Sequence, residues 1–469
     1  MIERGSEIEL DIDTIAFEGK AIGRLDGLVI FVTGAVPGDR VKARITKSKR
    51  DYAEAKTIEV VSPSPSRADP PCGYFGTCGG CKWQNLGYSE QLRFKEQHVR
   101  DALERTGGLR VEVAPAIAAD QIYEYRNKLE FTFSNNPFRI KENDTTQTAL
   151  GFHVPGRYDK VIDIDRCFLG DEKVNLILNW FRDLISREAG PNPAINIYDS
   201  ESHTGLLRFL TIRKSFASGE YMVSLVVLQE ADAIAAIAGS LKRDLPFVST
   251  FASIVNSTRA QVATGSSWKT HFGRGFIEDG IGDYSFRISP LSFFQTNSLQ
   301  SYKLYEEVSK QVIAGRNVLY DLYSGTGSIS IYLSNQAREV FGFELVQSSV
   351  DDAVENARLN GVRNTKFIKT DILDFFKGRD PVDNLVAAGI PLPDLIVLDP
   401  PRSGLHPKIA ATIHMLKAER IVYVSCNPMT QARDVKEIVS HGYTPLMSQP
   451  VDMFPQTYHI ENVLTLEKT

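Results

Sequence analysis

The sequence has few of the features that mark secreted or membrane proteins. Its 469 residues include only five cysteines, an odd, sparse set that is poor material for a disulfide framework. The charged N-terminus is followed by no apolar run, which argues against a signal peptide, and no stretch approaches the ~18 uninterrupted apolar residues of a membrane helix. Internal repeats and low-complexity segments are also lacking. We therefore expect a cytoplasmic protein without membrane association, and no feature indicates a protein partner.

The chain also lacks the excess of positive charge that would indicate a polyanion partner, since its net charge is -5. A nucleic-acid enzyme can still be acidic if its basic residues gather on one face. One such group is present between positions 40 and 50, where every charged residue is positive: Arg40, Lys42, Arg44, Lys47, Lys49 and Arg50. Charge alone favours a solvated strand edge for this group.

The length suggests about three domains. Residues 7–61 alternate apolar and polar side chains between turn signals, which predicts a small β-barrel of the OB type. Residues 62–71, rich in Pro and Ser, are typical of a linker. A helix is expected over residues 89–109, and mostly β structure over 125–272 with one helix near 173–187. After Asn297, helices alternate with near-continuous apolar strands, which predicts a doubly wound parallel α/β sheet.

A glycine-containing turn at residues 321–328 follows one of these apolar strands and precedes a helical pattern. Glycines at such a turn let the backbone approach a ligand closely. Glu344 ends the next strand, where a carboxylate can accept hydrogen bonds from both ribose hydroxyls of a nucleoside. The turn lacks the phosphate-binding Gly-x-Gly-x-x-Gly and the Walker lysine. These features favour a nucleoside cofactor without a pyrophosphate over NAD or ATP.

Two further carboxylates follow strands in the same half of the chain. Asp371 could reach the adenine of such a cofactor, and an acidic helix cap is an equally good interpretation. Asp399 begins an Asp-Pro-Pro-Arg motif whose prolines stiffen the loop. Residues at the carboxyl ends of strands line the ligand crevice of an open α/β sheet, so both are expected there.

Cys426 and Glu461 supply a nucleophile and a base for one difficult reaction. A lone cysteine is more often a buried small side chain, and Glu461 alone would be a surface acid. Carbon 5 of uracil, however, is a poor nucleophile. A thiolate that adds to carbon 6 makes carbon 5 able to attack a methyl donor, and a base then removes the proton from carbon 5. The sequence offers both groups beside the expected cofactor crevice.

Three other cysteines cluster in a glycine-rich segment with the spacing Cys72-x5-Cys78-x2-Cys81, and Cys167 is the expected fourth ligand. Zinc is the default partner of four cysteines, but structural zinc sites usually pair two short Cys-x(2–4)-Cys knuckles. The three-plus-one pattern fits an iron–sulfur cluster better.

Taken together, these motifs resemble those of the TrmA/RlmD family of uridine-5 RNA methyltransferases over nearly the whole chain. The matching segments are residues 293–297 (Phe-Phe-Gln-Thr-Asn), 321–327, 399–402, 425–428 (Ser-Cys-Asn-Pro) and 461–463 (Glu-Asn-Val). The resemblance implies that Cys426 is the nucleophile and Glu461 the base. It also implies that S-adenosylmethionine is bound by Gln295, Tyr323, Glu344 and Asp399, to which Asp371 is added from its position. Members with this cysteine pattern bind [4Fe-4S].

The N-terminal segment resembles a TRAM domain, an OB-like RNA-binding barrel, through residues 35–41. That resemblance implies that residues 40–50 contact RNA phosphates, which position RNA without reading its sequence. The expected organisation is a TRAM barrel over 1–61, an iron–sulfur-containing, mostly β central domain over 70–88 and 121–272, and a Rossmann-like class I methyltransferase domain over 89–120 and 273–469.

The expected function is methyl transfer from S-adenosylmethionine to carbon 5 of uridine in RNA through a Cys426–uracil adduct. Analogy favours large-subunit ribosomal RNA (23S) over transfer RNA as the substrate. A methyltransferase acting on an exocyclic amine needs no cysteine and usually has an Asn-Pro-Pro-aromatic loop, which this chain lacks. The alternative from another class is a non-catalytic iron–sulfur protein that binds RNA.

Overall fold

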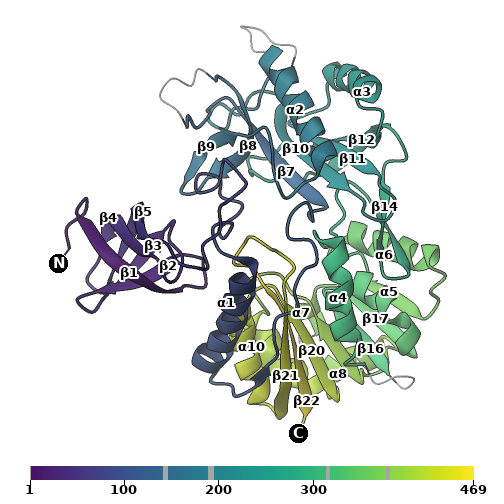
Figure 1. Cartoon of the computed structure of the whole chain (residues 1–469). Helices are drawn as coiled ribbons and strands as arrows, with labels where there is room; N and C mark the ends of the chain where they lie inside the picture. The colour runs from purple at the N-terminus through teal and green to yellow at the C-terminus, as the bar shows by residue number, and fades with distance from the viewer. Residues whose placement is uncertain (1, 141–145, 188–194, 313–316, 376–380) are drawn as a thin grey trace.

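The protein consists of an N-terminal barrel, an upper sheet domain and a lower α/β domain (Figure 1). The computed structural model describes residues 2–140, 146–187, 195–312, 317–375 and 381–469. Within these residues, no helix is long and apolar enough to cross a membrane.

The N-terminal barrel is closed, as the alternating pattern predicts. Its strands are β1 (Glu7–Ile15), β2 (Ala21–Leu25), β3 (Leu28–Thr33), β4 (Arg40–Ser48) and β5 (Tyr52–Ser62), in the order β1-β2-β3-β5-β4 with β4 pairing back to β1. Alternate residues such as Val41, Ala43 and Ile45 of β4 are buried in the barrel core. Their neighbours on β4 point outward, because successive side chains of a strand face opposite sides.

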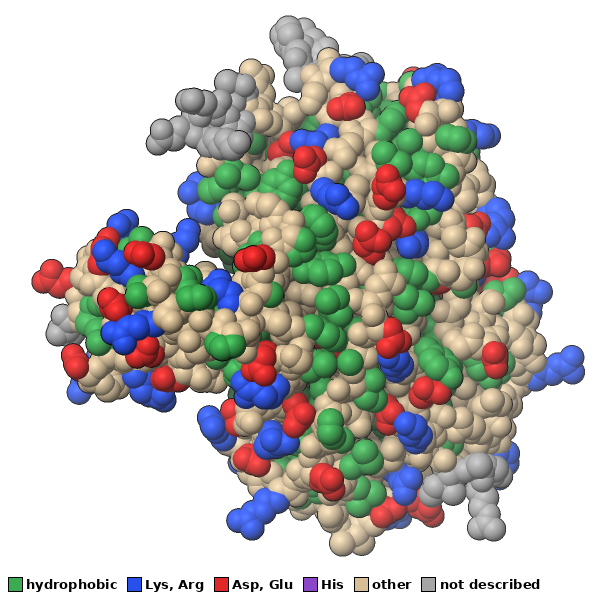
Figure 2. All heavy atoms as spheres, in the orientation of Figure 1, with side chains coloured by type: hydrophobic (Ala, Val, Ile, Leu, Met, Phe, Trp, Pro, Cys, Tyr) green, Lys and Arg blue, Asp and Glu red, His purple; other side chains and the backbone are tan. Residues whose placement is uncertain are grey.

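The outward-facing cations of β4 are neutralised within the barrel. Arg40 lies 2.6 Å from Glu9, and Lys42 and Arg44 lie 2.7 and 2.8 Å from Glu7. Lys47 pairs with Glu54 of β5. Positive and negative side chains are accordingly interspersed over this domain (Figure 2). Phosphate binding by residues 40–50 stays a prediction, and most of these cations would have to exchange a carboxylate for a phosphate.

The chain leaves the barrel through residues 63–87, which contain three of the cysteines, and enters helix α1 (Tyr88–Asp101). A short π-helix, η1 (Ala102–Gly107), continues α1 and ends at Gly108, whose φ of 66° is left-handed. This matches the helix expected over 89–109. The following strand β6 (Glu112–Val113) joins the lower sheet by pairing with β21 (Tyr443–Val451).

The upper domain is built on one seven-stranded sheet of order β13-β12-β11-β10-β7-β8-β9. Its strands are β7 (Lys128–Ser134), β8 (Ala149–Val154), β9 (Arg157–Asp163), β10 (Leu207–Lys214), β11 (Tyr221–Val227), β12 (Val248–Val255) and β13 (Ser267–Phe272). Helix α2 (Glu172–Arg187) lies where a helix was expected. Helix α3 (Asp232–Asp244) was not foreseen, although Ile234, Ile237, Ala238 and Leu241 recur with helical spacing and are all buried.

The lower domain contains an eight-stranded sheet of order β18-β17-β16-β19-β20-β22-β21-β6. Strands β16 (Val318–Leu322), β17 (Glu339–Glu344), β18 (Thr365–Lys369), β19 (Leu395–Leu398) and β20 (Arg420–Ser425) are parallel, and β22 (Glu461–Lys468) is antiparallel to β20. The strand order reverses at β16, which has β17 on one side and β19 on the other. Such a switch point opens a crevice at the carboxyl ends of the strands.

Helices flank this sheet, and a hairpin connects it to the upper domain. The helices are α4 (Ser298–Ser309), α5 (Ser328–Tyr332), α6 (Gln347–Leu359), α7 (Ile372–Phe375), α8 (Pro381–Ala387), α9 (Pro407–Thr412) and α10 (Pro428–Val439), with 3-10 turns η2 (Ser334–Gln336) and η3 (Ile413–Leu416). The hairpin is β14 (Ile277–Ile281) and β15 (Tyr284–Ile288). Its buried Phe286 packs against Phe294 beside the crevice.

From the sequence, residues 381–393 are expected to form a loop extension before the strand that ends in Asp399. That expectation is wrong for the first half of the segment, which forms α8. Pro381 suits the first turn of a helix, because N–H groups in that turn have no intrahelical acceptor and proline therefore loses no hydrogen bond there. Leu385 of this helix is buried in the lower core, so the segment contributes packing to the sheet domain.

The loop between β21 and β22, residues 452–460, is held in place by residues more than 350 positions earlier. Here it is called the return loop. Lys95 of α1 lies 2.6 Å from Asp452, and both side chains are fully buried. The Lys95 ammonium also donates to the carbonyl oxygen of Phe454, and Tyr88 donates to Asp452. Gln456, at a φ of 68°, accepts hydrogen bonds from the amides of Lys82 and Trp83.

We predict that Lys95→Met lowers the free energy of unfolding by about 3–5 kcal/mol, because Asp452 would be left as an unpaired buried charge. Urea unfolding followed by circular dichroism measures the change. The matched control is Lys95→Met with Asp452→Asn, which removes both charges and should recover a large part of the loss. Equal destabilisation in the single and double variants would contradict an essential ion pair.

Candidate active site and cysteine pocket

A cavity of about 620 Å3 opens at the carboxyl ends of the parallel strands of the lower sheet. Every residue that the sequence singled out for catalysis or cofactor binding lines it: Gln295, Tyr323, Glu344, Asp371, Asp399, Cys426 and Glu461. These residues come from seven different strand ends or loops, so only the fold brings them together.

The turn after β16 forms the floor of this cavity. Tyr323 adopts a φ of 72°, which is unusual for a residue with a side chain, and Gly325 and Gly327 are also left-handed. The amides of Tyr323 and Ser324 both donate to the carbonyl oxygen of Phe343 on β17. A Cβ at Gly327 would lie 2.7 Å from the ring of Phe367. The turn therefore depends on glycine both for conformation and for close packing.

The carboxylate of Glu344 is fixed at the end of β17 by two backbone amides. Its Oε2 accepts from Gly325 at 3.0 Å and its Oε1 accepts from Val346 at 2.8 Å. Phe293, Leu345 and Val346 beside it are more than half exposed although they are apolar. An acceptor next to an apolar lip is suited to a ribose joined to an aromatic base.

Asp371 lies on the same side of the cavity and caps helix α7. Its Oδ1 accepts from the amide of Leu373 at 2.9 Å. The capping interpretation is therefore correct, and because Asp371 also lines the cavity, its position is compatible with the ligand role as well.

Gln295 is placed by an asparagine from the upper domain. The Asn127 side-chain amide donates to the carbonyl oxygen of Gln295 at 2.8 Å and to the hydroxyl of Ser298 at 2.6 Å. The Gln295 amide in turn lies 3.5 Å from Asp399. Asn127 thus couples the upper domain to the wall of the cavity.

Two carboxyls at the cavity, Asp399 in its wall and the buried Asp321 close to Asp399, have no ion-pair partner among the described residues. Burial and the neighbouring Asp321 raise the pKa of Asp399 to about 7. Burial raises the pKa of Asp321 to about 6, although Ser330 donates to it from both its amide and its hydroxyl. A cationic ligand bound next to Asp399 would therefore interact favourably with its carboxylate form.

Cys426 and Glu461 are brought together by the antiparallel pairing of β20 and β22. Ser425 pairs with Asn462, so the next residue along β20, Cys426, lies opposite the preceding residue of β22, Glu461. Antiparallel strands put the end of one beside the start of the other. Glu461 is 5% exposed.

A buried hydrogen-bond network fixes this strand pair. Gln431 of α10 donates to the carbonyl oxygens of Tyr423 and Asn462, and the Asn462 side chain donates back to Gln431 at 2.7 Å. Ser448 donates to Asn462 from β21. All the side chains of this network are buried, so the strand that begins with Glu461 has little freedom to shift.

Burial and the carboxyls of Glu461 and Asp399 raise the pKa of the Cys426 thiol to about 12, against a smaller lowering by Arg402. The pKa of Glu461 is raised well above its usual range, mainly by burial and then by Asp399. With these neighbouring groups, Cys426 is a neutral thiol near neutral pH. Positive charge brought by a ligand would favour the thiolate.

Arg402 and Phe454 also line the cavity and were not assigned a role from the sequence. Arg402 lies over the ring of Tyr458 and donates to its hydroxyl at 3.3 Å. Its position in the same 399–402 motif as Asp399 could have identified Arg402 as a cavity residue from the sequence. Phe454 lies on the return loop, whose position depends on contacts with α1 that no local pattern reveals.

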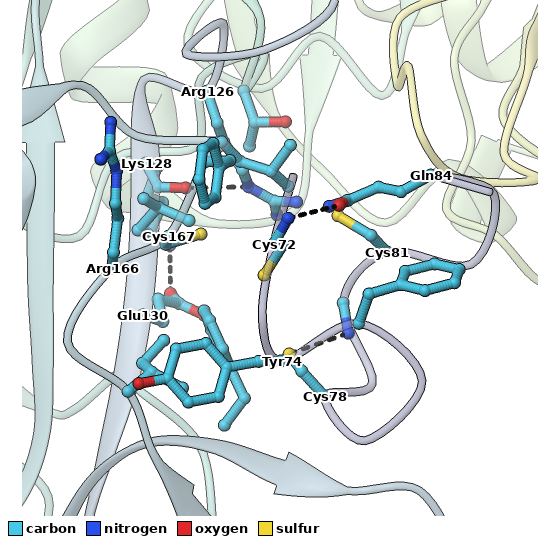
Figure 3. Close-up of a pocket in the computed structure, with 18 residues that line it drawn as sticks. Cys72, Tyr74, Cys78, Cys81, Gln84, Arg126, Lys128, Glu130, Arg166 and Cys167 are labelled. Atoms are coloured by element: carbon cyan, nitrogen blue, oxygen red, sulfur yellow. Dashed lines mark hydrogen bonds and ion pairs between the residues drawn. The ribbon is translucent and has the colours of Figure 1, made fainter. Parts of the chain in front are cut away.

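The four remaining cysteines line a second cavity of about 380 Å3 (Figure 3). Cys72, Cys78 and Cys81 come from the loop before α1, and Cys167 faces them from the upper domain. Burial raises the pKa of Cys78 to about 11 and that of Cys81 to about 12, and the neighbouring cysteines add to both shifts. Arg126, Lys128 and Arg166 share the wall of Cys167.

No three His, Cys, Asp or Glu side chains of the described residues converge closely enough to hold a single metal ion. Tetrahedral zinc, with Zn–S bonds of about 2.3 Å, would require sulfurs about 3.8 Å apart. The four cysteines line a cavity without meeting this distance requirement. The loop before α1 forms one side of the cavity, and the upper domain forms the other.

The fold and the cavity define a Rossmann-like methyltransferase preceded by a TRAM barrel. The family model described as tRNA (Uracil-5-)-methyltransferase matches residues 258–469, and the TRAM domain model matches residues 2–58. An uncharacterised RNA methyltransferase of Chlorobaculum tepidum is 41% identical, with 99% of this chain and 97% of the relative covered. Another from Porphyromonas gingivalis is 38% identical over 97% of this chain and 99% of the relative.

A crystal structure of the Pyrococcus abyssi tRNA (uracil-54, C5)-methyltransferase in complex with S-adenosyl-L-homocysteine superimposes with a TM-score of 0.73. It is 26% identical, and 98% of this chain and 100% of that chain are covered. The chain belongs to the RNA uracil-5 methyltransferase family and is an S-adenosylmethionine-dependent RNA methyltransferase, as the resemblance implied.

We predict that iodoacetamide alkylates Cys426 slowly near neutral pH and faster as the pH rises, because the thiolate fraction grows tenfold per unit below a pKa of about 12. Peptide mapping by mass spectrometry separates Cys426 from the other cysteines. Asp399→Asn should accelerate alkylation at about pH 9, where Asp399 is ionised, and have little effect at about pH 5, where it is protonated. A rate independent of both pH and Asp399 would contradict the coupling.

Proposed function

We propose that the protein methylates carbon 5 of a uridine in RNA through a transient covalent bond between Cys426 and carbon 6 of the uracil. The observation that carries this proposal is the position of Cys426 opposite the buried Glu461, in one cavity with Asp399 and Gln295. A nucleophile and a base on adjacent strand ends can act on neighbouring carbons of one flat ring.

The cavity fits S-adenosylmethionine, which supplies an electrophilic methyl group on a cationic sulfonium. The hydroxyls of Ser324 and Thr296 are buried in its wall without a partner in the described structure. Glu344 is placed for the ribose and Asp371 for the adenine. Asp399 and Gln295 are placed for the charged end of the donor, where positive charge would also lower the pKa of Cys426.

The chemistry then follows from the positions of two side chains. The Cys426 thiolate adds to carbon 6, which turns the ring into an enolate that is nucleophilic at carbon 5. Carbon 5 takes the methyl group, and Glu461 as carboxylate removes the proton that carbon 5 still holds. The electrons of that C–H bond restore the double bond and expel the thiolate. The products are 5-methyluridine, the demethylated donor and a proton.

Large-subunit ribosomal RNA (23S) is the proposed substrate, supported by the combination of a TRAM barrel with the cysteine cluster. Transfer RNA is the second candidate, because the similar Pyrococcus abyssi enzyme acts on uracil 54 of tRNA. A non-catalytic RNA-binding role is disfavoured by the intact pairing of Cys426 with Glu461.

We propose further that Cys72, Cys78, Cys81 and Cys167 hold a [4Fe-4S] cluster. The donor set carries the proposal, because four thiols line one cavity. Arg126, Lys128 and Arg166 would offset the negative charge of four thiolates. The cluster would hold the loop before α1 against the upper domain, and the methyl-transfer chemistry has no step for it.

We predict that Glu461→Gln accumulates a protein–RNA adduct, because the carbon 5 proton cannot leave, and slows turnover by about 10²- to 10⁴-fold. Labelled, unmodified transcripts of 23S ribosomal RNA and of tRNA are incubated with protein and donor, and denaturing gels reveal the adduct. The substrate is the transcript that forms it.

The matched control combines Glu461→Gln with Cys426→Ala, which should form no adduct with either transcript. Turnover of the Glu461→Gln variant at the parental rate would exclude Glu461 as the base. An adduct that persists without Cys426 would exclude Cys426 as the nucleophile.

For the cluster, we predict that protein purified without oxygen contains about four irons per chain and that Cys167→Ala loses most of them, because a cubane requires its fourth thiolate. Metal analysis and visible absorption report this independently of activity. Cys426→Ala serves as the control and should retain the iron. One zinc per chain in place of iron would contradict the proposal.

A further inference from the structure

The hairpin formed by β8 and β9 presents an unusually exposed aromatic side chain beside a basic depression. Tyr158, next to the hairpin turn, is 89% exposed. Arg157 and Lys160 flank it on β9, and Arg139 lies across a depression of about 690 Å3 that all three cations line. Basic side chains around an exposed aromatic ring are typical of RNA-binding surfaces.

The described lining of this depression contains cations, amides and apolar groups but no carboxylate. Arg157 is paired with Asp159 at 3.2 Å, whereas Arg139 has no ion-pair partner among the described residues. Lys160 donates to the Asn136 side chain. Among the described residues, Arg139 and Lys160 therefore have no acidic partner.

A row of neighbouring cavities, here called the path, lies between the depression and the active-site cavity, and each cavity shares lining residues with the next. The depression shares Pro137 and Phe138 with a neighbouring hollow, which shares Tyr74, Arg166 and Phe168 with the cysteine pocket. The cysteine pocket in turn shares Thr296 with the active-site cavity. The middle of this path is balanced in charge, because Arg182 pairs with Asp163, and it is rich in aromatic rings.

The path therefore has a reactive end, an aromatic middle and a basic end. The strand β9 lies on the side of the upper domain that faces the N-terminal barrel (Figure 1). A single RNA strand suits this order, because its bases can stack on aromatic rings while its phosphates contact Arg and Lys. A protein partner is disfavoured, because the described lining of the depression is mainly cations and amides, with Pro137 and Phe138 as its apolar members.

We propose that the depression lined by Arg139 and Lys160, together with the exposed Tyr158 on the same strand β9 as Lys160, is a second RNA subsite that binds single-stranded nucleotides flanking the target uridine. Tyr158 stacks on a base, and Arg139 and Lys160 contact phosphates. The inference rests on the proposed function, since it extends the RNA substrate of the active site along the path to this depression.

The charge part is tested with the full chain and a fluorescein-labelled single-stranded RNA of about 20 nucleotides, by anisotropy at several salt concentrations. Each lost phosphate contact on a single strand reduces the slope of log K against log salt by about 0.7. Arg139→Gln with Lys160→Gln should therefore reduce the slope by about 1.4. The matched control, Lys242→Gln with Lys468→Gln, removes two exposed cations elsewhere and should leave the slope unchanged.

The stacking part is tested by a pair of substitutions at Tyr158. Tyr158→Ala should weaken binding by about 5-fold or more without altering the salt slope, and Tyr158→Phe, which keeps the ring, should bind like the parent. Equal binding by the Ala and Phe variants would overturn the stacking role.

The outcomes separate this inference from the proposed function. If the parent binds RNA and forms 5-methyluridine but the Arg139/Lys160 variant keeps the parental slope, the subsite is wrong and the proposed function stands. If the parent fails to bind the labelled RNA, both are overturned.

Discussion

The antiparallel return of β22 beside β20 is the constraint on which the site depends. Five parallel strands end at one edge of the lower sheet, and that edge alone can place Asp321, Glu344 and Asp399 around a crevice. The base comes from the opposite direction. Because β22 is antiparallel to β20, its first residue, Glu461, lies beside Cys426, which directly follows the last residue of β20. The return loop before β22 is fixed by the buried Lys95–Asp452 pair, so α1 also supports this register.

The electrostatics of the cavity explain why the Cys426 thiol is protonated and unreactive without added positive charge. Asp321, Asp399 and Glu461 lie close together in a poorly solvated region, and the pKa of each is raised. Their negative charge and the burial of Cys426 keep the thiol protonated. A cationic ligand reverses this balance, since it stabilises carboxylates and thiolate together. The site therefore couples activation of the nucleophile to the presence of positive charge.

The lower domain could be predicted from the sequence largely because parallel strands are buried on both faces and appear as apolar runs. The carboxyl end of each run then identified Glu344, Asp371, Asp399 and Cys426 as neighbours. Helix α3 is not among the expected elements although its spacing is helical, and α8, which is only seven residues long, falls in a segment expected to be a loop extension. Phe454 could not be foreseen, because its position follows from a contact between Lys95 and Asp452. The pairing of the β4 cations with β1 and β5 was equally hidden, because it requires strand register.

The most direct test of uridine methylation is a mass-spectrometric nucleoside map of ribosomal and transfer RNA from cells that lack this protein, compared with the parent strain. The account predicts that 5-methyluridine disappears from one or two positions of 23S ribosomal RNA and returns when the parental gene is restored, but not when the Cys426→Ala variant is supplied. Loss in tRNA alone would keep the chemistry and change the substrate. An unchanged content of 5-methyluridine in both RNAs would contradict the central claim.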